Sequence, residues 1–368
     1  MQSIFQRMID EPRSISNGVK KEERHATLYR TYRPQSFKEV RGQPQVTDVL
    51  EKAIKNKKVA HAYLFSGSRG TGKTTVARIL ARELGVTSKD LYEMDAASSN
   101  SVDDIRELRE GVYTVPFESP YKFYIVDEAH MLSKAAWNAF LKTLEEPPSH
   151  AIFVLATTER DKVPDTIQSR CEIYSFKQPT REVLAGSVTD VAKKEGYTLE
   201  RSASDLIALL AEGSFRDALS ILQKVLAVSK DKKVDVSEVE AVSGAPRGEL
   251  IRQFLSALAK KDANAALSIV VEAVKQNIDV RTLTKLLIHR MRVVLLLRYA
   301  HDIAEWFSDE LTEADLALAK ELSKEPGVNS DTLKALLDAY SHMAYAVVPH
   351  LPLELAVIDI CRNEKKSA

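Results

Sequence analysis

The fold of the first half of the chain is decided by the stretch Gly67-Ser68-Arg69-Gly70-Thr71-Gly72-Lys73-Thr74. It matches the pattern G-x-x-x-x-G-K-[ST], follows an apolar run at 62–66 and precedes a helical pattern at 76–84. A strand, a glycine-rich loop and a helix in this order form a P-loop, whose backbone N–H groups and helix N-terminus bind phosphate. A chance match in a glycine-rich turn is the alternative, and the strand–loop–helix order argues against it.

The P-loop pattern also assigns roles to individual residues. Lys73 is expected to reach the β- and γ-phosphates of ATP, and the hydroxyl of Thr74 to ligate Mg²⁺. We expect the nucleotide-binding residues to run from Gly67 to Thr75, with the glycines allowing backbone N–H groups to curl around phosphate oxygens. The sequence therefore predicts that the chain binds and hydrolyses ATP.

Four further runs with strand character follow, at 91–95, 123–127, 151–156 and 173–176, with helical patterns between them. Three of the five runs are almost continuously apolar, as strands buried on both faces must be. The alternation predicts an α/β domain with a five-stranded parallel sheet over residues 26–178. After Pro179 strand-like runs vanish, and glycine-bearing breaks separate an all-α remainder into a small helical domain at 179–244 and a larger one at 245–368.

Composition excludes several classes of protein. Lys and Arg number 52, as do Asp and Glu, so the net charge of zero argues neither for nor against nucleic acid. The two cysteines, Cys171 and Cys361, cannot form a disulfide framework or a four-thiolate zinc site. No run approaches the ~18 apolar residues of a membrane span. Residues 1–25 are polar and lack an apolar signal core, so we expect a disordered extension, a cytoplasmic protein and no membrane partner.

Polar residues follow two of the expected strands. Asp127-Glu128 closes one strand, where Asp127 can hold Mg²⁺ and Glu128 can activate water for attack on the γ-phosphate. An acidic turn that only caps a helix is the alternative, and the P-loop argues against it. Thr157-Thr158 ends another strand, where a hydroxyl could help to place the water; threonine is also simply common at strand ends.

Two arginines lie in suggestive places. Ser169-Arg170-Cys171 precedes the last strand, and an arginine supplied to a neighbouring subunit can stabilise the transferring phosphoryl group. Arg216 falls in the first turn of a helix that Ser214 can cap, from which it could reach a bound phosphate. For both, an ordinary surface arginine paired with an acid is the alternative, and spacing alone does not decide.

These elements in this order resemble the AAA+ ATPases. The stretch 28–43, LYRTYRPQSFKEVRGQ, looks like the opening box of clamp-loader subunits. The stretches MDAASSN at 94–100, DEAHMLS at 127–133, AFLKTLEEPP at 139–148 and SRC at 169–171 are typical of the bacterial DNA polymerase III gamma/tau family. The resemblance covers about residues 26–245 strongly, and the remaining helices match in kind.

The resemblance implies an AAA+ P-loop domain at 26–178, a helical lid at 179–244 and a helical collar for oligomerisation at 245–368. Lys73 and Thr74 fall on the phosphate-binding motif, and Asp127 and Glu128 on the metal-binding and water-activating pair. Thr158 falls on the first sensor, Arg170 on the arginine finger that acts on a neighbour's ATP, and Arg216 on the second sensor. Arg33 and Val40 fall on contacts to the nucleoside.

The chain departs from the family pattern in two places. Gamma/tau subunits usually carry a four-cysteine zinc module after the P-loop helix, and residues 85–90 replace it here without cysteine. We therefore expect ATP and Mg²⁺ but no structural zinc. The chain also ends at Ala368, without the long tail of tau, so we do not expect it to tether the polymerase or the helicase.

The implied function is ATP-driven loading of a ring-shaped sliding clamp onto primed DNA in replication. The implied partners are delta and delta-prime subunits, other copies of the chain, the clamp and primed DNA, in a bacterial cytoplasm near the nucleoid. Another AAA+ DNA-remodelling ATPase is one alternative, and translocation on DNA would distinguish it. A mainly structural subunit akin to delta-prime is the other, and inability to bind ATP would favour it.

Overall fold

The computed structural model describes residues 27–98, 102–300 and 311–362. Contacts divide the chain into two compact units, residues 1–184 with 213–220, and residues 185–212 with 221–368. Residues 215–220, which begin a helix that runs on to residue 228, therefore belong to the first unit. The expected three-part division remains a prediction, and the expected extension at 1–25 lies outside the described residues. Within the described residues, no helix is both long enough and apolar enough to cross a membrane.

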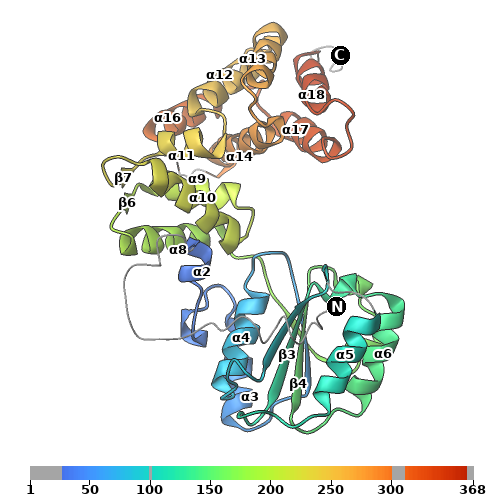
Figure 1. The fold of residues 1–368 in the computed structure, drawn as a ribbon. Coiled ribbons are helices and arrows are strands. Elements are labelled where there is room, and N and C mark those ends of the chain that lie inside the picture. Colours follow the sequence, from blue (N-terminus) through green and yellow to red (C-terminus); the bar gives the residue numbers. More distant parts are fainter. Residues whose placement is uncertain (1–26, 99–101, 301–310, 363–368) are drawn as a thin grey trace. The chain divides into compact units, whose positions relative to one another are not determined.

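The first unit is built on a parallel sheet with the order β2-β3-β4-β1-β5, which confirms the predicted α/β fold and the five strands in the described part of the chain. Figure 1 shows helices on both faces of this sheet. The elements are α2 (Leu28–Thr31), η2 (Phe37–Glu39), α3 (Pro44–Lys55), β1 (Ala62–Ser66), α4 (Lys73–Glu83), β2 (Leu91–Asp95), α5 (Val102–Val112), β3 (Lys122–Asp127), η3 (Ala129–Met131), α6 (Lys134–Glu145), β4 (Ala151–Thr157), η4 (Arg160–Lys162), α7 (Asp165–Gln168) and β5 (Glu172–Ser175).

Both faces of the three central strands, β3, β4 and β1, are buried, and their side chains alternate between two apolar clusters. Tyr63 and Phe65 of β1 pack with α3 and α4, whereas Leu64 of the same strand packs with α5 and α6. All seven residues of β4 are buried, which explains its continuously apolar sequence.

The parallel register brings the carboxyl ends of three strands together. Ser66 at the end of β1 pairs with Thr157 at the end of β4, and β4 pairs with β3, which ends at Asp127. The P-loop follows β1, Asp127-Glu128 spans the end of β3, and Thr157-Thr158 spans the end of β4. Ligands of open parallel sheets bind at this edge, so the fold places the predicted site residues where a site is expected.

The second unit is largely helical. Its elements are α8 (Arg181–Lys194, begun in the first unit), β6 (Thr198–Leu199), α9 (Arg201–Leu210), α10 (Phe215–Val228, after its first turn), β7 (Lys233–Val234), α11 (Val236–Ser243), α12 (Gly248–Ala259), α13 (Ala263–Lys275), α14 (Val280–Tyr299), α16 (Glu313–Leu322), α17 (Ser330–His342) and α18 (Leu351–Arg362). The expectation that strands vanish after Pro179 is wrong, because β6 and β7 form a small parallel sheet. Strands of two residues are too short to show a period of two.

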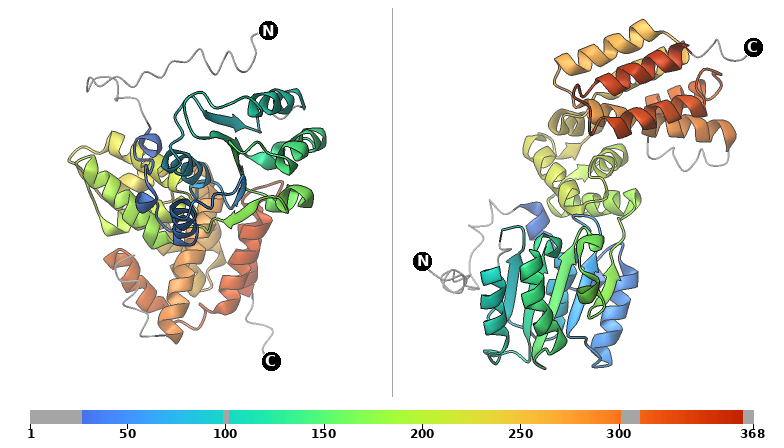
Figure 2. Two further views of the ribbon diagram at one scale, coloured as in Figure 1. Left: turned by 90° about the horizontal axis from the view of Figure 1, so that it is seen from below. Right: turned by 90° about the vertical axis from the view of Figure 1, so that its right-hand side faces the viewer.

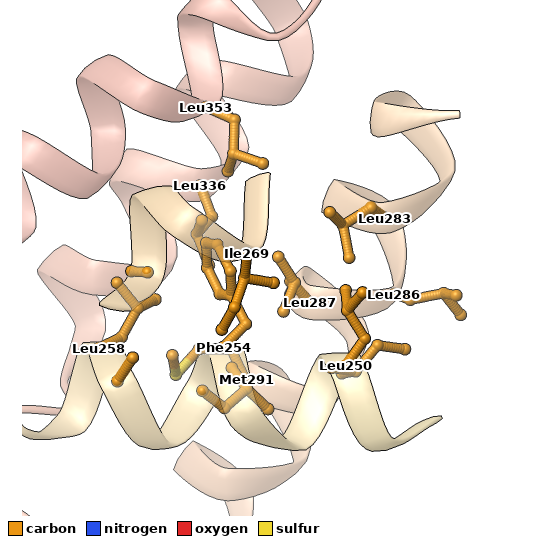
Figure 3. Packing of buried hydrophobic residues seen from close by; sticks show 14 of the residues in the cluster. Leu250, Phe254, Leu258, Ile269, Leu283, Leu286, Leu287, Met291, Leu336 and Leu353 are labelled. Carbon is orange, nitrogen blue, oxygen red and sulfur yellow. The ribbon is translucent and has the colours of Figure 1, made fainter. Parts of the chain in front are cut away.

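A single apolar cluster holds the long helices of this unit together. α12 packs on α13, α14 on α17, and α17 on α18. The right-hand view of Figure 2 shows the orange and red helices of this unit lying side by side. Figure 3 shows Phe254, Ile269, Leu287 and Met291 gathered from three of these helices. Burial of such side chains contributes about 1.5–3 kcal/mol each, so this unit has a core of its own.

Candidate nucleotide-binding site

The P-loop turns through three glycines with positive φ angles, which residues with a Cβ atom rarely adopt. A Cβ on Gly67 would lie 2.4 Å from the carbonyl oxygen of Phe176, and one on Gly70 would lie 2.0 Å from Oγ of Ser214. Around Gly72 nothing lies within 4 Å of the corresponding position. The loop therefore needs glycine at two positions for space and at the third for its backbone angle.

Lys73 begins α4 and lies against the loop that precedes it. Its ammonium donates hydrogen bonds to the carbonyl oxygens of Gly67 at 2.7 Å and Ser68 at 2.9 Å. Burial lowers the pKa of Lys73, while the carboxylates of Glu128 and Asp127 act in the opposite direction. A buried cation at a helix N-terminus inside a glycine loop is suited to bind phosphate oxygens.

Thr74 and Asp127 meet across the edge of the sheet. The hydroxyl of Thr74 donates to Oδ2 of Asp127 at 2.7 Å, and Oδ1 of Asp127 accepts from the backbone N–H of Glu128 at 3.0 Å. A hydroxyl and a carboxylate fit Mg²⁺, which takes few protein ligands and completes its shell with phosphates and water. No group of three His, Cys, Asp or Glu side chains suited to hold a metal occurs in the described residues; the predicted absence of zinc remains a prediction.

Glu128 and Thr158 are also brought together. The hydroxyl of Thr158 donates to Oε2 of Glu128 at 3.2 Å. Glu128 has a left-handed backbone (φ 47°), which aims its side chain differently from that of an extended strand residue. The predicted water activator and the predicted sensor therefore form one polar pair, although their catalytic roles remain predictions.

Arg216 reaches the same edge of the sheet through the start of α10. The hydroxyl of Ser214 accepts from the backbone N–H of Asp217 at 3.2 Å, which confirms the predicted cap, and the N–H of Phe215 donates to the carbonyl of Gly70 at 3.0 Å. The guanidinium of Arg216 lies 5.6 Å from the ring centroid of Tyr29, within cation–π range.

Arg33 is half-buried among other charges. Burial lowers the pKa of Arg33, and the neighbouring Arg78 and Arg216 act in the same direction, while Glu93 opposes them. Arg78 pairs with Glu93. Val40, the other predicted nucleoside contact, ends η2 and packs against the apolar cluster of α3 and α4. A concentration of positive charge beside the P-loop favours an anionic ligand.

Arg170 is the predicted site residue that the structure places elsewhere. Its guanidinium donates to the carbonyl of Thr166 and to Oε1 of Glu145, each at 2.7 Å, so it lies between α6 and α7. This position neither supports nor excludes a role in a neighbouring subunit's site.

Three residues at the site, Gln43, Tyr29 and His130, carry no predicted role from the sequence. Gln43 is fully buried and joins the P-loop to the segment after β5, because its Nε2 donates to the carbonyl oxygens of Lys177 at 2.7 Å and Thr71 at 3.4 Å. Tyr29 lies under Arg216, and His130 lies 3.1 Å from the hydroxyl of Thr157. His130 had a signal, its place two residues after Glu128 of the acidic pair, whereas the contacts of Gln43 and Tyr29 are tertiary.

Comparisons with known families agree with this site. The family described as "DNA polymerase III, delta subunit" matches residues 42–99 and 86–180. The family described as "DNA polymerase III clamp loader subunit, ATPase lid domain" matches residues 184–231.

Curated relatives decide the family. A DNA polymerase III subunit gamma of Buchnera aphidicola is 37% identical over 252 residues, which cover 62% of this chain and 69% of that protein. This chain belongs to the DNA polymerase III gamma/tau family. The subunit tau of Bacillus subtilis is 36% identical over 369 residues, which cover 94% of this chain and 64% of that protein. The chain thus spans less than two thirds of several longer gamma/tau relatives that it matches.

Solved structures agree on the fold. RuvB of Thermotoga maritima, described as a Holliday junction branch migration motor, is similar with a TM-score of 0.50 and 24% identity. The match covers 62% of this chain and 79% of that chain. At this identity the similarity shows the AAA+ fold of the gamma/tau chain and nothing about its substrate.

Proposed function

We propose that this chain is an ATPase motor subunit of a bacterial DNA polymerase III clamp loader, which uses ATP to open a sliding clamp and load it on primed DNA. The observation that carries the proposal is the meeting of Lys73, the Thr74–Asp127 pair and the Glu128–Thr158 pair at the carboxyl ends of adjacent strands. Membership of the gamma/tau family supports the choice of this reaction among those that a P-loop can perform.

Each residue of the site has its own role in ATP hydrolysis. Lys73 exchanges its two loop carbonyls for phosphate oxygens, which the ammonium binds more strongly because they are charged. Thr74 and Asp127 would hold Mg²⁺, and the bound ion would neutralise charge on the β- and γ-phosphates. Glu128 orients water and accepts its proton, while the hydroxyl of Thr158 holds one oxygen of that carboxylate.

Two arginines would complete the site. Arg216 lies in the first turn of α10, next to Gly70 of the P-loop, where it would report the presence of phosphate to the helices that follow. Arg170 would act on the ATP of a neighbouring copy or subunit, after giving up its contact with Glu145. In this proposal ATP binds at subunit junctions, which couples assembly to hydrolysis.

The proposed partners are delta and delta-prime subunits, further copies of this chain, the sliding clamp and primed DNA. We propose a cytoplasmic location with association to the nucleoid.

A clamp-loading assay tests the proposal. The chain is combined with delta, delta-prime and labelled clamp, and the clamp retained on nicked circular DNA is counted after gel filtration. We expect loading that requires ATP and is lost in Lys73→Ala, while Lys58→Ala, a change at an exposed lysine outside the site, loads normally. Loading by Lys73→Ala, or none by the wild-type assembly, would contradict the proposal. Movement along DNA in place of loading would favour a remodelling ATPase.

A further inference from the structure

His130 is a buried side chain at the candidate site to which no step above gives a role. It lies in η3, and its side chain is 7% exposed. Its Nδ1 lies 3.1 Å from Oγ1 of Thr157 and 3.6 Å from Oε2 of Glu128, and its Nε2 lies 3.3 Å from Oε1 of Glu159. The ring therefore contacts groups that follow both β3 and β4.

The hydroxyl of Thr157 has a second contact besides the ring. The backbone N–H of Glu159 donates to Oγ1 of Thr157 at 3.0 Å, and the hydroxyl keeps a hydrogen that it can donate. In the tautomer with its hydrogen on Nε2, the ring of His130 accepts from Thr157 at Nδ1 and turns its N–H toward the carboxylate of Glu159.

This tautomer has a consequence for Glu128. With Nδ1 serving as an acceptor for Thr157, the ring fills the space beside the Glu128 carboxylate without donating to it. Instead, Oε2 of Glu128 accepts a hydrogen bond from the hydroxyl of Thr158, and the backbone N–H of Glu128 donates to Oδ1 of Asp127.

We propose that His130 is a positioning residue for ATP hydrolysis. Its ring joins Thr157 at the end of β4 to the turn that carries Glu128, and so fixes the direction in which that carboxylate faces water. The ring acts through Glu128 and not on the substrate. This inference rests on the proposed function, because it refines the role of Glu128 in the same site.

Steady-state ATPase measurements on the full chain test the proposal. We expect His130→Ala to lower kcat by about tenfold or more and to leave KM for ATP within about twofold, because ground-state binding is untouched. His130→Asn should recover most of kcat, since its amide oxygen can replace Nδ1 as the acceptor for Thr157. His130→Gln, which extends to the position of Nε2, should not.

Two controls separate positioning from folding. His150 is another partly buried histidine of the same unit, with Nε2 2.9 Å from the carbonyl of Val112, and His150→Ala should leave kcat unchanged. Thr157→Val keeps the buried volume but removes the hydroxyl, and it should reproduce the kcat of His130→Ala. Equal losses of kcat in His130→Asn and His130→Ala would overturn the proposal, as would a normal kcat in Thr157→Val.

A double-mutant comparison shows whether His130 acts through Glu128. Glu128→Gln alone should lower kcat by about 10²–10⁴-fold, and adding His130→Ala should cause no further fall, because the two residues act as one unit. Falls that multiply would overturn the inference. An active Glu128→Gln chain, or a wild-type chain without ATPase, would instead contradict the proposed function, whatever the His130 variants do.

Discussion

A Cβ atom on Gly70 would lie 2.0 Å from Oγ of Ser214 and 2.8 Å from its Cβ. The backbone N–H of Phe215 also donates a hydrogen bond to the carbonyl of Gly70, so the first turn of α10 rests directly on the P-loop. The conformation of the loop and the position of Arg216 are therefore coupled through this contact.

Gly70→Ala should consequently weaken both folding and ATP binding. The methyl group must displace Ser214, and overpacking of this kind costs about 1–3 kcal/mol. Because φ at this residue is +75°, alanine would also be strained. We expect a lower Tm and a higher Kd for ATP, measured by thermal unfolding and by titration with a fluorescent nucleotide.

Two further variants control this experiment. Gly72→Ala carries the same kind of backbone strain, at φ +103°, but meets nothing within 4 Å, so its loss of stability should be smaller. Ser214→Gly combined with Gly70→Ala removes the colliding atoms and should recover part of the Tm. Equal effects of the two glycine changes would argue against the steric explanation.

The Thr74–Asp127 pair predicts a magnesium-dependent defect. Thr74→Val removes the hydroxyl that donates to Asp127 and would ligate the ion, whereas Thr74→Ser keeps it. We expect Kd for ATP in Mg²⁺ to rise at least about tenfold in Thr74→Val, or about 1.4 kcal/mol, and to stay near wild type in Thr74→Ser. With EDTA in place of Mg²⁺ the three proteins should bind alike. A defect that persists in EDTA would show that the hydroxyl acts on the fold instead.

Asp90 predicts a pH-dependent contribution to stability. Burial by itself would raise the pKa of Asp90, but hydrogen bonds from the backbone N–H groups of Glu118, Phe117 and Ser119 outweigh it, and the pKa is lowered. A lowered pKa means that the ionised form stabilises the fold above the ordinary value of about 3.9, and that this contribution is lost as the pH falls through the folded value.

Asp90→Asn should therefore lower Tm most clearly between pH 5 and 8, by an amount that corresponds to about 1–3 kcal/mol for the lost charged acceptor. The difference from wild type should begin to shrink near pH 4, where this carboxyl protonates in the unfolded chain, and should be lost as the pH falls through the lowered pKa of the folded state. Thermal unfolding across this range measures it. A difference that is the same at every pH would contradict the electrostatic origin.

Arg170 and Glu145 predict a defect that needs a neighbouring subunit. Their contact is a partly exposed ion pair, and such pairs contribute at most about 1 kcal/mol. Arg170→Ala should therefore fold and bind ATP normally, yet lower turnover in the assembly by about 10³-fold if the guanidinium completes another site. Glu145→Gln should have a far smaller effect, with the adjacent exposed Glu146→Gln as its control. Assemblies that combine wild-type and Arg170→Ala subunits and still turn over ATP at the wild-type rate would contradict action on a neighbour.

The centre of the sheet was predictable from the sequence because strands buried on both faces are almost continuously apolar, and the edge strands β2 and β5 followed from the alternation of strand and helix patterns. The five strands lie within a residue of the predicted runs, from Ala62–Ser66 to Glu172–Ser175. The two-residue strands β6 and β7 were not predictable, because so short a run has no periodicity.

The candidate site divides in the same way. Gly67–Thr74 and Asp127-Glu128 follow strands in the sequence, and parallel strands must end at one edge, so their meeting could be predicted. The contact of Arg216 with Tyr29 and the bridge made by Gln43 join residues more than 100 positions apart, and no local pattern indicates them. The trans action of Arg170 depends on a second subunit, which the sequence of one chain does not describe.

The ATPase rate of the chain assembled with delta, delta-prime and sliding clamp, measured with and without primed DNA, tests the proposed clamp-loading function. We expect strong stimulation by clamp and primed DNA together, lost in Lys73→Ala and in Arg170→Ala, with Arg170→Ala still binding ATP. A rate indifferent to the clamp, or normal turnover of the Arg170→Ala assembly, would contradict it.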